Sequence, residues 1–232
     1  MSGRIITDMP KLLSPFMRDV QADNTVTPVV RPGYEWVFTD PNVRAVEKLH
    51  GTNVSILLNA VPNSPNYFLK SVYNRMNHIS TGVLSNHVYI KGIRNAHAKG
   101  YFTLNEPGQF FGELVGPNIH GNELELEEPI WFPFQYLYGD IKGSTFAYKC
   151  FHEHEKTFEN LSSWFKDYLF SLVYRKFHEG AHKPPEGVVF YHPDGRMAKL
   201  RRDMFDWYEG PRHKQDDKSE WPISQVKGEI NE

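Results

Sequence analysis

The sequence predicts an α+β domain built from antiparallel sheets flanked by helices. Short apolar segments alternate with turns rich in glycine, proline and asparagine, which is typical of β-strands. One later segment repeats apolar residues at the helical period. The turn His192-Pro193-Asp194-Gly195 separates two apolar segments, as in a β-hairpin. A hairpin pairs its two strands in antiparallel fashion, so we expect antiparallel sheets.

Short segments rich in β-branched or aromatic residues are expected to be strands. They are residues 36–38, 43–48, 53–58, 67–72, 109–115, 136–141, 187–191 and 196–201. We expect residues 27–34, which hold two prolines and a glycine, to be irregular.

Two helices are predicted. Val88, Ile93 and Ala96 indicate a helix over about residues 85–99. The clearer helix covers 160–177, where a stripe of apolar residues recurs at spacings of three and one. Residues 210–232 are mostly polar. We therefore expect one domain over 1–205 and a polar tail over 206–232, with no second domain.

Composition excludes several classes of protein. Of the 232 residues, 40% are hydrophobic and 23% are charged, which excludes wholesale disorder. The sequence has no apolar run of membrane-spanning length and no signal-peptide pattern at its start. Cys150 is the single cysteine, which excludes an intramolecular disulfide and fits a reducing, cytoplasmic setting. The net charge of −2 gives no global sign of nucleic-acid binding.

The segment with the most chemical promise begins at Lys48, between two predicted strands. A lysine at a strand end, followed by a glycine turn at Gly51, can direct its amine into a cleft. Near other cations such an amine loses its proton more readily and becomes a nucleophile. A surface hairpin is the alternative interpretation, and this segment alone does not exclude it.

Further charged residues occupy predicted strands. Glu113 lies within an apolar strand, where a buried carboxylate needs a partner or a ligand hydroxyl. Glu186 directly precedes another strand and is suited to hold a metal ion. Lys199 and Arg201 alternate with apolar residues, so they share one strand face that suits a polyphosphate. Solvent-exposed strand faces and loops are the alternatives for all of these residues.

Five segments in this order resemble the motifs of the covalent nucleotidyltransferases, which include ATP-dependent ligases and mRNA capping enzymes. The segments are residues 48–53, 111–116, 136–140, 186–189 and 199–201, spread over about 45–205. His-Gly-Thr-Asn at 50–53 resembles the RNA ligase 2 family more closely than DNA ligases or capping enzymes, which usually have Asp at the position of His50. The resemblance implies a nucleotidyltransferase fold, the ATP-grasp-like catalytic domain of ligases.

The resemblance also implies roles for individual residues. Lys48 would attack the α-phosphate of ATP and form a lysyl–AMP intermediate, and Lys199 would favour the neutral amine at Lys48. Glu186 would place Mg²⁺ or Mn²⁺. The other residues that would bind ATP are Glu47 (adenine), Asn53, Arg75, Glu113 (ribose), Tyr136 (stacking on adenine) and Arg201 (phosphate). A core tyrosine is the alternative for Tyr136, and Arg201 replaces the second lysine that the fifth motif usually carries.

The nucleic-acid steps would involve His50, Asn53, Lys70 and Arg75. The implied activity is ATP-dependent RNA ligation: AMP passes from Lys48 to a 5′-phosphate, and the end is then sealed to a 3′-hydroxyl. RNA ends or nicks are the expected partners, with a role in RNA repair, and we expect a monomer. The alternatives are a ligase that prefers DNA or mixed nicks, and a non-catalytic nucleic-acid-binding protein that retains the fold.

A local basic region reconciles nucleic-acid binding with the near-neutral net charge. We expect basic residues around Lys48, Lys70, Arg75 and Lys199 to bind phosphate, offset elsewhere by acidic residues such as Glu123. The binding of nucleic-acid strands to this protein should then be weak and strongly salt-sensitive.

Overall fold

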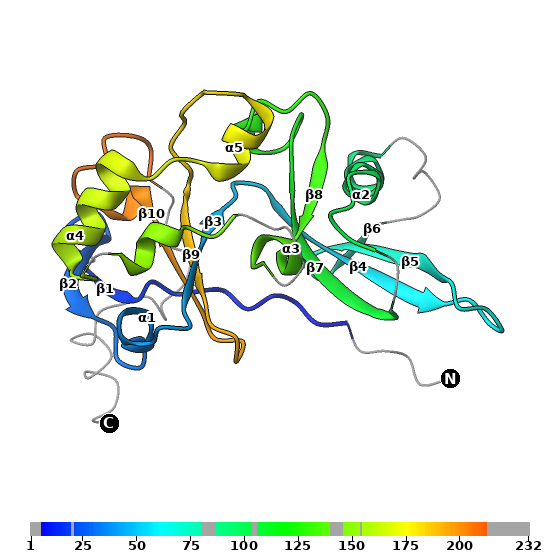
Figure 1. Cartoon of the computed structure of the whole chain (residues 1–232), viewed down its shortest axis with the longest axis horizontal. Helices are drawn as coiled ribbons and strands as arrows, with labels where there is room; N and C mark the ends of the chain where they lie inside the picture. The colour runs from blue at the N-terminus through cyan, green and yellow to red at the C-terminus, as the bar shows by residue number, and fades with distance from the viewer. Residues whose placement is uncertain are drawn as a thin grey trace. The chain divides into compact units, whose positions relative to one another are not determined.

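A computed structural model describes residues 6–19, 21–79, 87–103, 106–139, 146–153 and 155–212 (Figure 1). The chain divides into two compact units. The first unit comprises Met1–Lys11, Leu49–Thr145 and Lys176–His178. The second comprises Leu12–Lys48, Phe146–Arg175 and Glu179–Glu232. Both units lie largely within residues 1–205, and the assignment of that stretch to a single catalytic domain stays a prediction.

The first unit is built on a five-stranded antiparallel sheet with the strand order β6-β5-β4-β7-β8. Its strands are β4 (Thr52–Ala60), β5 (Tyr67–Asn74), β6 (Asn77–Ile79), β7 (Gly108–Val115) and β8 (Ile130–Pro133). The helix α2 (Val88–Ala98) packs on this sheet through Ile90, Ile93 and Ala96. Gly92 permits the close approach, because a Cβ there would lie 2.3 Å from a Leu114 methyl. The short elements η2 (His120–Asn122) and α3 (Phe134–Leu137) complete the unit.

The second unit contains a three-stranded antiparallel sheet with the order β10-β9-β3, and a two-stranded sheet of β1 and β2. The strands are β1 (Phe16–Asp19), β2 (Thr25–Val30), β3 (Arg44–Lys48), β9 (Gly187–Tyr191) and β10 (Met197–Arg201). The helical elements are α1 (Trp36–Thr39), η3 (Lys149–His152), α4 (Phe158–Ser163), η4 (Trp164–Tyr168) and η5 (Arg202–Met204). The helix α5 (Leu172–Phe177) begins in this unit and ends in the first.

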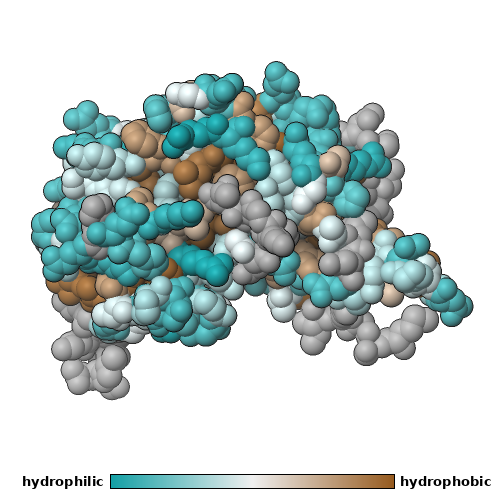
Figure 2. All heavy atoms as spheres, viewed as in Figure 1, coloured by the Kyte–Doolittle hydropathy of each residue, from teal (hydrophilic) through white to brown (hydrophobic). Residues whose placement is uncertain are grey.

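One face of the β10-β9-β3 sheet forms the core of the second unit. Ala45, Val188, Phe190, Ala198 and Leu200 are almost fully buried and pack against the helical elements. The surface around α4 is mostly hydrophilic in Figure 2, while Leu161 of α4 and Phe165 of η4 are buried. The α+β class with antiparallel sheets flanked by helices is therefore confirmed. None of the helices in the described ranges combines the length and apolar composition needed to span a bilayer.

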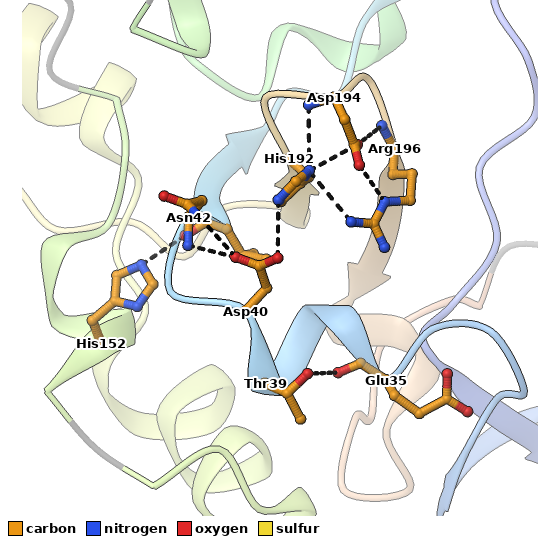
Figure 3. Close-up of polar contacts among 9 residues, drawn as sticks. Glu35, Thr39, Asp40, Asn42, His152, His192, Asp194 and Arg196 are labelled. Carbon is orange, nitrogen blue, oxygen red and sulfur yellow. Dashed lines mark hydrogen bonds and ion pairs between the residues drawn. The ribbon is translucent and has the colours of Figure 1, made fainter.

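The hairpin turn between β9 and β10 is confirmed, and a polar network around His192 holds it (Figure 3). His192 Nδ1 lies 2.8 Å from Asp194 Oδ1, and its Nε2 lies 3.1 Å from Asp40 Oδ2. The Arg196 guanidinium contacts the other Asp194 oxygen at 2.8 Å. A hydrogen bond from the Arg196 backbone N–H is the largest cause that lowers the pKa of Asp194, to about 2. Gly195 supplies the left-handed conformation (φ +95°) that closes the turn.

Most predicted elements are confirmed, and the exceptions are short aromatic segments. The strands predicted at 43–48, 53–58, 67–72, 109–115, 187–191 and 196–201, and the described part of the helix at 85–99, match the structure. The strand predicted at 36–38 is wrong, because the Val37 and Phe38 amides bond to carbonyls three residues back and form the helical turn α1.

The strand predicted at 136–141 is also wrong over its described residues 136–139. Residues 130–138 are apolar or aromatic almost throughout, so no period distinguishes strand from helix. The strand β8 occupies the first part and ends at Pro133, whose fixed φ suits the start of α3. The positions 140–141 lie outside the described residues.

The long helix predicted over 160–177 is interrupted. It consists of α4, the π-helical turn η4 and α5, with Leu169–Ser171 between them in non-helical conformation. Ser171 explains the interruption, because its hydroxyl donates to the buried Glu47 carboxylate at 2.5 Å and its amide bonds to the Lys183 carbonyl at 2.7 Å. These contacts come from distant parts of the chain, which a local apolar period does not reveal.

The N-terminal part of the second unit contains more strand than predicted. Residues 27–34 were expected to be irregular, but Thr25–Val30 forms β2 and pairs with β1, which was not predicted. Pro28 is tolerated because this sheet has only two strands, so each is an edge strand. The short strand β6 was also missed. Most of the predicted tail, from 213 onward, lies outside the described residues.

Burial of Glu47 predicts a pH-dependent stability. Desolvation raises the pKa of this carboxyl to about 7, although Ser171 and Val173 donate to it and act in the opposite direction. Between pH 4.5 and 7 the unfolded chain ionises Glu47 while the folded chain keeps it neutral. The free energy of unfolding should therefore fall as pH rises through this window, by on the order of 3 kcal/mol from this residue.

The variant Glu47→Gln isolates this contribution, since glutamine does not ionise. Urea unfolding at pH 4.5, 6 and 8 should show that the wild type loses stability relative to E47Q as pH rises. A constant difference between the two proteins across these pH values would contradict a buried, neutral Glu47.

Candidate functional site

Three positively charged residues of the predicted site, Lys48, Lys199 and Arg201, lie on one face of the β10-β9-β3 sheet. Lys48 and Arg201 both pair with Gly187, one from each side of the central strand β9. Lys199 pairs with Val189, two residues further along the same strand. Residues directly opposite in antiparallel strands share a face, and side chains two residues apart do as well. The register therefore places all three cations on the same side of the sheet.

This cationic face lies opposite the core face. The core-facing residues that alternate with the cations, including Glu47, Ala198 and Leu200, are almost fully buried. Lys48, Lys199 and Arg201 are only partly buried. Alternation along β3 and β10 thus places Ala198 and Leu200 on the core face and the three cations on the other face, beside the buried Val46.

Glu186 forms an ion pair with Lys48. The Lys48 Nζ lies 2.5 Å from Glu186 Oε2, and the two side chains are 23% and 8% exposed. Glu186 directly precedes Gly187, the residue opposite Lys48, so the pairing of β3 with β9 brings the two side chains together. Because the carboxylate is largely buried, removing Lys48 would leave it without this compensating charge.

Arg201 is oriented by a second acidic residue. Its Nε donates to Asp203 Oδ1 at 2.9 Å, and both side chains are largely buried. A guanidinium has further N–H donors beyond Nε, so this contact fixes the plane of the group while leaving it able to bind phosphate. The backbone amide of Lys199 donates to the Leu13 carbonyl at 2.9 Å, which ties β10 to the preceding N-terminal segment of the same unit.

Gly187 is required where the strands meet beneath the cations. A Cβ at this position would lie 2.2 Å from the Leu200 carbonyl oxygen and 2.7 Å from the Arg201 Cα. Both are backbone atoms of β10, so neither can rotate away. We expect Gly187→Ala to destabilise the protein by about 1–3 kcal/mol. Thermal unfolding would measure this loss, and an unchanged melting temperature would contradict the close strand contact.

A second group of predicted site residues lies in the first unit. The Gly51 amide donates to Glu113 Oε1 at 3.1 Å, and Asn53 pairs with Glu113 across β4 and β7. Gly51 allows this approach, since a Cβ there would lie 2.3 Å from the Leu114 carbonyl oxygen and 2.9 Å from Glu113 Cγ. His50 contacts Glu123, with 2.7 Å between Nδ1 and Oε1. The predicted residues His50, Asn53 and Glu113 therefore share one strand end.

The remaining predicted site residues lie elsewhere on their units. Tyr136 is buried in α3, where its ring stacks on Tyr101 at a centroid distance of 4.5 Å and its hydroxyl accepts from Lys176 at 3.1 Å. Arg75, in the turn after β5, pairs with Asp8 at 3.3 Å, while Lys70 is exposed on β5.

The packing of Tyr136 is that of a core aromatic residue, the alternative given above. Glu47 is buried on the core side of its sheet rather than on the cationic face. Adenine stacking by Tyr136, adenine contact by Glu47 and phosphate binding by Lys70 and Arg75 stay predictions.

Sequence reasoning missed two acidic residues that orient predicted site residues. Asp203 follows Arg201 by two positions, and this spacing on a strand end is a signal that sequence inspection can use. Glu123 contacts His50 from a loop far along the chain, and no local sequence pattern predicts that contact.

No protein-family model and no curated protein matches this chain. Solved structures of an RNA ligase from Naegleria gruberi are similar to it. The form with ATP and Mn is 17% identical, with a TM-score of 0.47, over 87% of this chain and 59% of that one. The form with AMP and Mn is 18% identical, with a TM-score of 0.48, over 86% and 59%.

The form of the same ligase with PPi is 18% identical, with a TM-score of 0.45, over 86% of this chain and 59% of that one. The chain thus spans about three fifths of the length of these proteins.

Proposed function

We propose that this protein is an ATP-dependent RNA ligase resembling the RNA ligase 2 family, with Lys48 as its nucleophile. The observation that carries the proposal is the shared strand face of Lys48, Lys199 and Arg201, with Glu186 paired to Lys48. Four residues from three of the five ordered motifs gather in one unit. A lysine nucleophile beside two phosphate-binding cations is the arrangement that nucleotidyl transfer requires.

The reaction begins at the Lys48 amine. The Nζ–P bond to the α-phosphate of ATP forms as the P–O bond to pyrophosphate breaks, and Nζ loses a proton. Since Nζ attacks only in its neutral form, the ammonium must first give a proton to the Glu186 carboxylate or to water, and the proton lost after bond formation passes to water. Lys199 and Arg201 would neutralise charge on the phosphates, which is the main catalytic contribution in phosphoryl transfer.

One residue of this group, Glu186, has a side chain that can bind a divalent cation. Mg²⁺ is commonly bound by one or two carboxylates together with substrate phosphates, so Glu186 alone would serve as its protein ligand. Within the described ranges no group of three or more metal-ligating side chains occurs. The cation would offset phosphate charge. We propose Mg²⁺ or Mn²⁺ in this role.

The residues of the first unit would serve the nucleotide sugar and the nucleic acid. Glu113, fixed by the Gly51 amide, has an acceptor suited to ribose hydroxyls. We propose that AMP passes from Lys48 to a 5′-phosphate, and that a 3′-hydroxyl then displaces AMP to seal the strand. His50, Asn53, Lys70 and Arg75 are proposed to act in these steps.

A panel of substrates tests the strand preference. The protein with ATP and Mg²⁺ would be offered nicked double-stranded RNA, nicked double-stranded DNA and single-stranded RNA, with sealing followed on denaturing gels. Sealing of RNA, reduced as salt increases, is the expected result. Sealing of DNA alone would contradict the RNA assignment. A protein that binds these strands without sealing any would favour the non-catalytic alternative.

A further inference from the structure

His50 contacts two residues of the loop between β7 and β8, which contains η2. Its Nδ1 lies 2.7 Å from Glu123 Oε1, and its ring stacks on His120 at a centroid distance of 5.0 Å and an interplanar angle of 29°. The neighbouring Gly51 is fixed against β7, because its backbone N–H donates a hydrogen bond to the Glu113 carboxylate. The imidazole is therefore held in position by contacts with its ring as well as by its backbone.

The loop that carries His120 and Glu123 has an unusual backbone. Asn118, His120 and Asn122 all adopt positive φ, at 65°, 40° and 50°, although none is glycine. Left-handed residues outside glycine cost about 1 kcal/mol or more each and cluster at functional sites. The same loop carries both side chains that contact His50, His120 and Glu123.

Hydrogen bonds hold the loop in this conformation. The Asn122 side chain donates to the Leu126 carbonyl at 2.9 Å and accepts from the Leu126 amide at 3.1 Å. A ring nitrogen of His178 contacts the Leu124 carbonyl at 2.9 Å. The strained loop is thus fixed on both sides of Glu123, as expected for a support that positions a functional side chain.

The contact with Glu123 decides which ring nitrogen of His50 carries a proton. A carboxylate accepts from Nδ1–H, so a neutral His50 keeps its lone pair on Nε2. Such an imidazole offers an acceptor of defined direction. A surface contact of this kind adds little to stability, because Glu123 is half-exposed, so its main effect is on orientation.

We propose that Glu123 is the positioning residue for His50, and that it holds the Nδ1–H tautomer that the nucleic-acid steps of the ligase reaction require. The inference rests on the proposed function. It adds to that function a residue from outside all five motif segments, which acts through His50 rather than on the nucleotide.

The test compares Glu123→Met, which keeps the approximate size and removes the acceptor, with Glu127→Met, a matched control on the same loop, where Glu127 is exposed. Imidazole ¹⁵N spectra of the full chain report the His50 tautomer, with His50→Gln to assign its signals. The rate of Lys48 adenylylation by ATP and the rate of sealing of a pre-adenylylated nicked RNA are measured separately. We expect E123M, which removes the acceptor, to lose the Nδ1–H signature and to lower the ratio of sealing to adenylylation about tenfold, with E127M unchanged.

The outcomes separate this inference from the proposed function. An unchanged His50 tautomer in E123M, or a ratio of the two rates within about twofold of wild type, overturns the positioning role. A parallel loss of both rates also overturns it, because it indicates a general structural effect. A wild type that neither accepts AMP from ATP nor seals the pre-adenylylated nick contradicts the proposed function instead.

Discussion

Lys48→Ala will abolish the transfer of AMP from ATP to the protein and, with it, ATP-dependent sealing. No other group can take the place of the Nζ nucleophile in forming the lysyl–AMP bond. We expect the rate to fall to the background of the assay, measured as labelled protein and as sealed strand. The fold should persist, although the Glu186 carboxylate loses its partner at 2.5 Å, and thermal unfolding of the variant would check this.

A pre-adenylylated strand separates the chemistry of Lys48 from binding. Because such a strand already carries AMP on its 5′-phosphate, K48A should retain measurable sealing of it in the absence of ATP. Full ATP-dependent activity in K48A would contradict the assignment of the nucleophile. A variant that unfolds would be replaced by Lys48→Met, which keeps much of the side-chain volume.

Lys199→Ala should lower the rate of adenylylation about 10²–10³-fold, the loss typical of one pre-organised charge that stabilises a transition state. Lys199 lies on the same sheet face as Lys48 and alternates with buried residues of β10. Single-turnover labelling with ATP would measure the rate. Lys199→Arg, which keeps the charge, should recover part of it.

Lys149→Ala provides the matched control for Lys199→Ala. Lys149 is an exposed lysine of the same unit and lies in η3, outside the cationic face. Its removal changes the net charge by the same amount and should leave the labelling rate within about twofold of wild type. Equal losses in both variants would indicate a general charge effect and would contradict a specific role for Lys199.

The cationic face could be predicted from sequence because it depends on local rules. The hairpin turn fixes how β9 pairs with β10, and a period of two then places Lys199 and Arg201 on one face. The resemblance to the ordered nucleotidyltransferase motifs assigns Lys48 and Glu186 to the same predicted ATP site. The structure adds the register, in which Lys48 on β3 and Arg201 on β10 both pair with Gly187 of the central strand β9. It also adds the ion pair between Lys48 and Glu186.

The features that sequence did not predict depend on contacts between distant residues. The helix over 160–177 is interrupted because Ser171 bonds to Glu47, a residue far away in the sequence, and the local helical period gives no sign of that contact. Tyr136 was assigned to a strand because its surroundings are aromatic throughout, yet β8 ends just before it. Glu123 reaches His50 through a left-handed loop that propensity disfavours.

The most direct test of the central claim is the covalent adduct itself. The wild-type protein would be incubated with α-labelled ATP and Mg²⁺, denatured and digested, and the labelled peptide identified by mass spectrometry. We predict one AMP on Lys48, stable to base and released by acid, as expected of a phosphoramidate. An absence of label on the wild type, or label on a residue other than Lys48, would contradict the account.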